Sequence, residues 1–301
     1  MELTGRLGLG LIRGLQYSSS ACHGECITQY TTQLQFIYLW LLVFNTRSGS
    51  TLLETMLDAH PEIWGMGEDS VFSGHLEPFL LALENAISID TGGNQTTGET
   101  IKVVANYGKF VIKEMSQASL STTGKVSRYI VDKHLANFIN IGEYFFVDFK
   151  FLLFLKLYRV WFLDLINLVF PQAVIIHISR DPMDALFGMY KQNFLRLDWT
   201  QNATRLVEVY AHYLKVMQHV RRQHPGRVIE IRWEDQLKDW KSAARDLASP
   251  WLGWTRYEDL VADPTKILKG LTDVLELDWD PAMLKFHETK RVVFTQSQQR
   301  K

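Results

Sequence analysis

Residues 42–69 read LVFNTRSGSTLLETMLDAHPEIWGMGED, and this stretch decides the fold. Its first residues end an apolar run at 36–44, FIYLWLLVF, whose aromatic and branched residues predict a strand buried on both faces. A turn at 45–49 follows, and helical spacing then runs from Ser50 to about Ala59. A buried strand that passes through a short turn directly into a helix is typical of α/β proteins.

The turn between this strand and this helix has the composition of an anion-binding loop. In Arg47-Ser48-Gly49-Ser50-Thr51, the small residues let the backbone approach an anion closely, and Arg47 adds a cation with several donors. Free N–H groups at the start of the following helix, together with the helix dipole, attract phosphate or sulfate. The loop is not a Walker A motif, because it lacks Gly-Lys-[Ser/Thr]. Taken alone, it leaves both an anion site and a plain tight turn open.

The remaining chain alternates between strand and helix patterns. The runs AVIIHIS at 173–179 and RVIEI at 227–231 predict further strands. Helices are expected from about 182 to 193, with proline in the first turn, and over 204–224, where apolar residues recur on one face. The composition of 91–100, TGGNQTTGET, predicts a loop. The alternation predicts an α/β fold: a parallel sheet flanked by helices on both faces, with ligands beyond the carboxyl ends of its strands.

The bulk composition excludes several classes of protein. The chain has 301 residues, of which 47% are apolar and 22% charged, as in an average soluble protein, and this length suffices for one α/β domain. Its net charge of −1 argues against a general nucleic-acid binder or a membrane-surface protein, so an anion would need a local site. Cys22 and Cys26 with His23 are too few ligands for structural zinc, and we expect no metal site.

Two apolar segments do not have the pattern of membrane spans. The run at 36–44 is too short to cross a bilayer as a helix, and charges interrupt the second run, at 144–170, which is better suited to an amphipathic or partly buried helix. Residues 1–35 lack a continuous apolar core, so we expect a poorly ordered leader and no signal peptide. The compartment stays open between the cytoplasm and, if the true start lies upstream, the Golgi.

The loop and a series of later motifs resemble the sulfotransferases that use 3′-phosphoadenosine 5′-phosphosulfate (PAPS), in particular the tyrosylprotein and tetratricopeptide-linked types. The matching motifs follow in the family's order over roughly residues 40–299, and are specific only jointly. After the loop they are Leu57-Asp58-Ala59-His60-Pro61, Gly67-Glu68, Asp132-Lys133, Ser179-Arg180-Asp181-Pro182, Arg256-Tyr257-Glu258-Asp259-Leu260 and Phe286-His287. The resemblance implies a sulfotransferase fold similar to that of P-loop nucleoside triphosphate hydrolases.

The resemblance also implies roles for individual residues. Residues 47–51 would hold the 5′-phosphosulfate, and Glu68 would act as the base that removes the proton of the acceptor hydroxyl. Because the spacing near this position differs between subfamilies, Asp69 is an alternative base. Lys133 would stabilise the charge that grows on the bridging oxygen as the phosphosulfate bond breaks.

Three further residues are implied to lie near the nucleotide or the sulfuryl group. Arg180 would bind the 3′-phosphate, Tyr257 would lie near the nucleotide, and Ser297 near the sulfuryl group. Relatives carry a serine eight residues after the arginine, where this chain has Gly188, so one hydroxyl donor is missing. The implied co-substrate is PAPS without a metal, and the acceptor is a hydroxyl of a peptide tyrosine, a glycan or a small molecule.

The chain departs from the family pattern at several places. We interpret about 143–168 and 231–255 as insertions within a sulfotransferase domain at 36–301, and relatives continue beyond the position of Lys301. Three functions stay open: an active PAPS-dependent sulfotransferase, a catalytically impaired relative that only binds nucleotide, which Gly188 and the missing final segment favour, and a kinase-like P-loop protein. The last rests on fold analogy alone.

Overall fold

The computed structural model describes residues 39–42, 47–68, 71–92, 98–124, 127–133, 166, 169–170, 173–192, 198–223, 228–229 and 252–288. Within these residues the chain forms a six-stranded sheet in the order β2-β3-β1-β4-β6-β5, and every neighbouring pair is parallel. The strands are β1 (Leu39–Leu42), β2 (Ile63–Gly67), β3 (Tyr129–Asp132), β4 (Val174–Ser179), β5 (Val228–Ile229) and β6 (Leu252–Arg256). The α/β architecture predicted from the alternation of patterns is confirmed.

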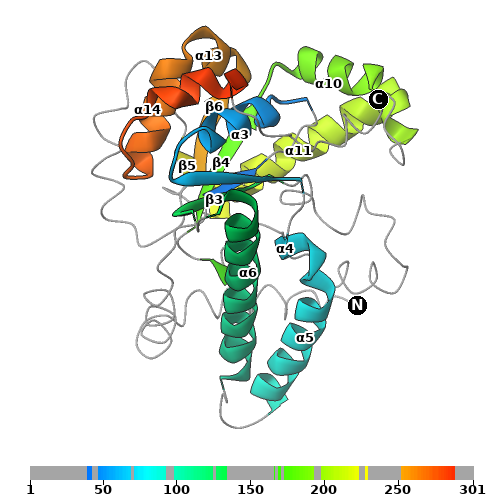
Figure 1. Cartoon of the computed structure of the whole chain (residues 1–301). Coiled ribbons are helices and arrows are strands. Elements are labelled where there is room, and N and C mark those ends of the chain that lie inside the picture. The colour runs from blue at the N-terminus through cyan, green and yellow to red at the C-terminus, as the bar shows by residue number, and fades with distance from the viewer. Residues whose placement is uncertain are drawn as a thin grey trace.

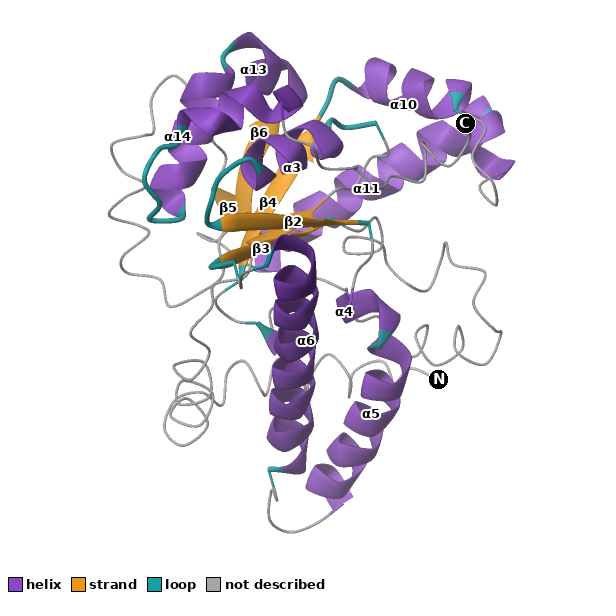
Figure 2. Ribbon diagram, in the orientation of Figure 1, coloured by secondary structure: helices purple, strands orange, loops and turns teal. Residues whose placement is uncertain are grey.

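Helices pack on the sheet and extend beyond it (Figures 1 and 2). They are α3 (Ser50–Asp58), α4 (Val71–Gly74), α5 (Leu76–Gly92), α6 (Glu99–Thr123), α10 (Pro182–Lys191), α11 (Ala203–Gln223), α13 (Tyr257–Ala262) and α14 (Pro264–Val274), with 3-10 turns η3 (Asp198–Gln201) and η4 (Pro281–Glu288). Figure 1 shows α5 and α6 side by side, projecting from the sheet away from α13 and α14.

One face of the sheet is covered by α3, α14 and η4. Alternate residues of β4, including Ile176 and Ile178, point to this face because side chains along a strand alternate between the two sides. They join a single apolar core with Leu57 of α3 and Leu268 of α14, both fully buried. Burial of a leucine side chain contributes about 1.5–3 kcal/mol, so this core holds α3, and the loop that precedes it, against the sheet.

The opposite face of the sheet carries a polar contact with α11, and Asp132 of β3 acts electrostatically on Tyr107 of α6. His177 of β4 is fully buried there, and its Nε2 lies 2.8 Å from the hydroxyl oxygen of Tyr213 on α11. Tyr107 of α6 stacks on Phe79 of α5, and its hydroxyl donates to the carbonyl oxygen of Phe72 at 2.5 Å. Burial raises the pKa of Tyr107, and the charge of Asp132 raises it further. Helices therefore cover both faces, as the sequence predicted.

Replacement of Tyr213 by phenylalanine is expected to lower the free energy of unfolding by about 1–3 kcal/mol, because it removes one partner of a buried hydrogen bond. Urea denaturation measures this change. Tyr190→Phe is the control, since the Tyr190 side chain lies on α10 with 47% exposure and should change the unfolding free energy little. Equal midpoints for Tyr213→Phe and the wild type would contradict the role given to the pair.

The helix predicted to open with proline has the expected cap. The Asp181 carboxylate accepts hydrogen bonds from the N–H groups of Met183 and Asp184, at 2.9 and 3.2 Å, and Pro182 is the first helical residue. The helix ends at Lys191, two residues before the predicted boundary. The other predicted helix, 204–224, is α11, and the predicted strand at 227–231 is the shorter β5.

The predicted loop at 91–100 is shorter than its composition indicates. Residues 91 and 92 still belong to α5, and α6 already begins at Glu99. The carboxylate of Asp90 accepts hydrogen bonds from the N–H groups of Glu99 and Thr100, at 3.3 and 3.0 Å, so a polar side chain caps the start of α6. The prediction was wrong at both ends because threonine and glycine serve here as helix termini.

The predicted insertions fall mostly outside the described residues. Residues 252–255, which end the second of them, form most of β6 between β4 and β5, and in the first only Ile166 is described. The leader at 1–35 is also outside. Among the described helices, none is both long and apolar enough to cross a membrane.

Candidate anion-binding and transfer site

The sheet brings the predicted site residues to one edge. Arg47 follows β1, Glu68 follows β2, Lys133 follows β3, Arg180 follows β4 and Tyr257 follows β6. These five strands are neighbours in the sheet, and the carboxyl ends of parallel strands lie on the same side. Two predicted residues, Asp69 and Ser297, lie outside the described residues.

The loop after β1 is held in an unusual backbone conformation. Arg47 and Gly49 have φ angles of 78° and 92°, in the left-handed region that costs a non-glycine residue about 1–3 kcal/mol. Ser48 between them is fully buried, and its hydroxyl oxygen has no hydrogen-bond partner among the described residues. Gly49 is the N-cap of α3. Because glycine has no side chain, it cannot cap the N–H groups in the first turn of this helix. This arrangement can receive an anion at the helix N-terminus.

Tyr257 explains why position 49 must be glycine. A Cβ atom built on Gly49 would lie 2.1 Å from Cδ2 of the Tyr257 ring, so the ring occupies the space that any side chain would need. The Arg180 guanidinium carbon lies 4.4 Å from the centre of the same ring, and its NH1 donates to the carbonyl oxygen of Arg47 at 3.2 Å. The Tyr257 ring thus joins the loops after β1 and β4 into one unit.

A carboxylate of α13 holds the loop after β4 in place. Glu258, the residue after Tyr257, accepts a hydrogen bond from the N–H of Asp181 at 2.9 Å, and its other oxygen lies 3.6 Å from Nε of Arg256. This contact fixes the backbone next to Arg180 against the start of α13. Sequence reasoning quoted Glu258 as part of a motif but gave it no role.

Lys133 is buried, with 2% of its side chain exposed, and meets residues of two other motifs. Its Nζ lies 3.0 Å from Oε1 of Glu68 and donates to Oγ1 of Thr51 at 3.2 Å. A buried ammonium requires anionic or polar partners, because its charge is poorly solvated away from water. The contacts bring the predicted base, the predicted cation and the loop at 47–51, predicted to bind an anion, together.

Glu54 is a member of this group that sequence reasoning missed. It lies one helical turn after Ser50 on α3, and only 3% of its side chain is exposed. Its Oε2 lies 3.7 Å from Nζ of Lys133, and its Oε1 accepts a hydrogen bond from the N–H of Gly67 at 2.6 Å. The signal in the sequence is a glutamate inside the apolar helical stretch LLETML, where a buried charge needs a partner.

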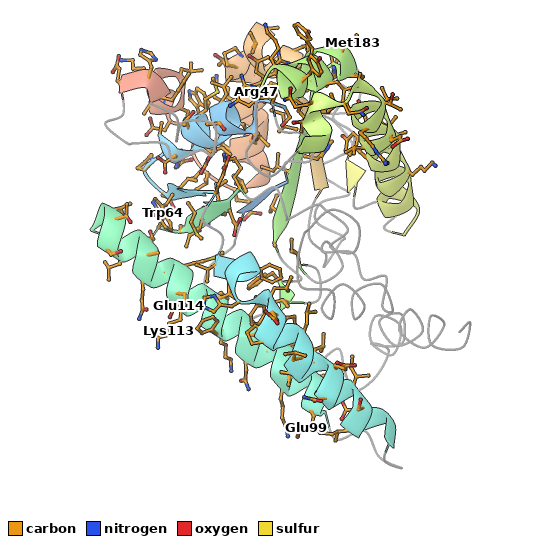
Figure 3. All side chains as sticks on the ribbon, turned by 90° about the vertical axis from the view of Figure 1, so that its right-hand side faces the viewer. Arg47, Trp64, Glu99, Lys113, Glu114 and Met183 are labelled. Carbon is orange, nitrogen blue, oxygen red and sulfur yellow. The ribbon has the colours of Figure 1, made fainter. Side chains whose placement is uncertain are left out.

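Gly188 lies against the side chain of Arg47. A Cβ atom built on Gly188 would lie 3.2 Å from both Cβ and Cγ of Arg47. Figure 3 shows Arg47 and Met183 of α10 at the end of the molecule opposite Glu99. A side chain at position 188 would therefore be in tight contact with Arg47, which would have to shift by a few tenths of an ångström.

The described residues contain no cluster of three or more histidine, cysteine or acidic side chains that could hold a metal ion, and the pair Cys22 and Cys26 lies outside them. The arrangement provides groups that can bind anions: the N-terminus of α3, two arginines and a lysine. A partly exposed carboxylate lies beside them.

Three solved structures that match this chain are sulfotransferases or sulfotransferase domains. The domain from the curacin biosynthetic pathway has a TM-score of 0.50 at 17% identity, covering 86% of this chain and 80% of that one. The domain from the Synechococcus PCC 7002 olefin synthase has a TM-score of 0.47 at 21% identity, covering 85% and 79%. Mouse sulfotransferase SULT7A1 complexed with PAP has a TM-score of 0.35 at 14% identity, covering 87% and 67%. The first of these supports the fold.

An uncharacterised relative and a family model match the sequence of this chain. An uncharacterised protein of Aquifex aeolicus (strain VF5) is 24% identical over 260 residues, which are 83% of this chain but only 27% of that protein, so this chain spans about a quarter of its relative's length. The tyrosylprotein subtype stays a prediction. The model of the sulfotransferase family matches residues 41–254, more than half of the chain and most of its sheet. With this match, the chain belongs to the sulfotransferase family.

Proposed function

We propose that this protein transfers a sulfuryl group from PAPS to a hydroxyl group of an acceptor. The observation that carries the proposal is the buried Lys133, whose Nζ lies 3.0 Å from the Glu68 carboxylate and 3.2 Å from Thr51 at the start of α3. A cation, a base and an anion-binding helix end in mutual contact are what sulfuryl transfer requires, since the reaction asks for positioning and charge stabilisation.

Each residue has a role in this mechanism. The N-terminus of α3 and Arg47 hold the 5′-phosphosulfate, and Arg180, supported by Tyr257, holds the 3′-phosphate. The acceptor hydroxyl gives its proton to Glu68 as its oxygen forms a bond to sulfur. The bond between sulfur and the bridging phosphate oxygen breaks, and 3′-phosphoadenosine 5′-phosphate (PAP) leaves with the electron pair. The Lys133 ammonium stabilises the charge on that oxygen.

Glu68 can serve both the lysine and an acceptor because it is accessible. About a fifth of its side chain is exposed, against 2% for Lys133. A carboxylate at the rim of the site can turn toward an incoming hydroxyl group, whereas the lysine stays fixed below it. The chemical class of the acceptor, a peptide tyrosine, a glycan or a small molecule, is the open part of the proposal.

Calorimetric titration with PAP tests the nucleotide site. We expect the wild type to bind PAP with micromolar affinity, and both Arg47→Ala and Arg180→Ala to weaken binding by about tenfold or more, because each removes a charged hydrogen-bond donor. Arg205→Ala is the matched control, since this arginine lies exposed on α11 in an ion pair with Glu208. A folded wild type that shows no PAP binding would contradict the proposal.

A nucleotide-binding protein without turnover is the second candidate, and Gly188 is the observation that favours it, because the hydroxyl donor that relatives offer is absent. Incubation with sulfur-labelled PAPS and, in turn, a simple phenol, a tyrosine-containing peptide and an oligosaccharide distinguishes the two. Labelled product supports the sulfotransferase. PAP binding with no labelled product from any acceptor class supports a protein that only binds nucleotide. Competition of Mg-ATP with PAP would support a kinase-like protein.

A further inference from the structure

Glu54 uses its two carboxylate oxygens on two different parts of the site. Oε1 accepts a hydrogen bond from the N–H of Gly67 at 2.6 Å, and Oε2 lies 3.7 Å from Nζ of Lys133. The side chain is 3% exposed and comes from α3, whereas Gly67 is the last residue of β2 and Lys133 directly follows β3. One buried carboxylate therefore connects the helix behind the anion loop with the ends of two strands.

The contact with Gly67 fixes the peptide that leads into Glu68. Gly67 has a φ of 79°, so the chain turns sharply at this residue. Its N–H is held by Glu54, and its carbonyl oxygen accepts a hydrogen bond from the N–H of Lys133 at 3.2 Å. With the peptide groups on both sides of Gly67 fixed, the direction in which Glu68 leaves the strand is fixed as well.

The contact with Lys133 balances its charge. Among the described residues, the buried ammonium has two carboxylates within 4 Å, Glu54 and Glu68. If Glu68 were its sole counter-ion, the turn of Glu68 toward an acceptor would leave a buried charge without an anion, which is strongly unfavourable. Glu54 removes this obstacle because it cannot leave: it is buried and held at Gly67.

We propose that Glu54 is a positioning residue for the transfer reaction, a permanent counter-ion of Lys133 that frees Glu68 to act on the acceptor. The inference rests on the proposed function. Glu54 takes no proton and touches no substrate in this scheme. It acts through Lys133 and through the backbone before Glu68, and its removal should affect the chemical step more than the binding of nucleotide.

Glu54→Gln tests the role, because glutamine keeps the volume and an oxygen for Gly67 but carries no charge. We expect kcat for sulfuryl transfer to fall by about 10–100-fold while the Kd for PAP changes by less than about threefold, a split that marks an interaction used in the transition state. Glu77→Gln, an exposed glutamate of α5, should leave both values unchanged.

A residue that only supports the fold would behave differently. It would lower the melting temperature, the affinity for PAP and kcat together, and that result would overturn the inference, as would an unchanged kcat. If Glu54→Gln does not fold, Glu54→Asp serves as the test, because its shorter side chain cannot reach both partners. In that variant kcat must fall while the Kd for PAP stays unchanged. A wild type that neither binds PAP nor transfers sulfate would instead overturn the proposed function and this role with it.

Discussion

Gly49→Ala is expected to abolish PAP binding and to lower the free energy of unfolding by about 2–5 kcal/mol. Two costs combine at this position. The φ of 92° disfavours any residue with a Cβ atom, and that atom would lie 2.1 Å from the Tyr257 ring. The ring must move, and with it the surface on which Arg180 rests. Calorimetry with PAP and thermal unfolding measure the two effects.

Two matched variants separate these costs. Gly74→Ala in α4 has nothing within 4 Å of its added Cβ atom, so it should keep PAP binding and wild-type stability. Gly49→Ala combined with Tyr257→Ala relieves the clash but not the backbone strain, and should regain part of the lost stability. Full PAP binding by Gly49→Ala would show that the loop is not the anion site.

Lys133→Met should reduce sulfuryl transfer by about 10²–10³-fold, the effect typical of losing one group that stabilises developing charge. The same change should lower the free energy of unfolding by about 3–5 kcal/mol, because it leaves the buried Glu54 without its ammonium. Steady-state kinetics and urea denaturation give both values. The exposed Lys113→Met on α6 is the control and should affect neither.

A double variant distinguishes the catalytic loss from the loss of stability. Glu54→Gln with Lys133→Met removes both charges, so stability should return toward that of the wild type, since a buried pair replaced as a whole is often neutral. Activity should stay low, because no cation faces the leaving oxygen. Recovery of activity together with stability would mean that Lys133 supports the fold and does not take part in the chemistry.

Local signals explain which parts of the fold could be predicted from the sequence. The β1–loop–α3 unit and the β4–α10 unit each combine an apolar run with a recognisable helix start, such as the Asp181 cap before Pro182. The paired helices α5 and α6 were not predicted. Their connection is rich in residues typical of loops, and the capping contact of Asp90 with Glu99 and Thr100 joins residues nine and ten positions apart.

The site could be predicted in its residue types but not in its connections. Glu68 and Lys133 were named because their motifs resemble a family, and the structure puts them 3.0 Å apart. Glu54 and Glu258 were not given roles, because their contacts depend on the order of strands. In particular, β3 lies between β1 and β2 although it follows both in sequence, and this crossover brings Lys133 next to α3. Periodicity carries no information about that order.

The packing of the Tyr257 ring on Gly49 also constrains how the protein matures during synthesis. The anion loop emerges early from the ribosome, but the ring that covers it belongs to α13, which follows β6 near the end of the described chain. The amino-terminal strands can begin to collapse while translation continues. The loop can reach its final packing only when β6 has joined the sheet and carried the ring into position, because this contact spans most of the sequence. A nascent chain stalled before β6 would therefore have the strand, the loop and the helix, but not the packing of the Tyr257 ring on the loop.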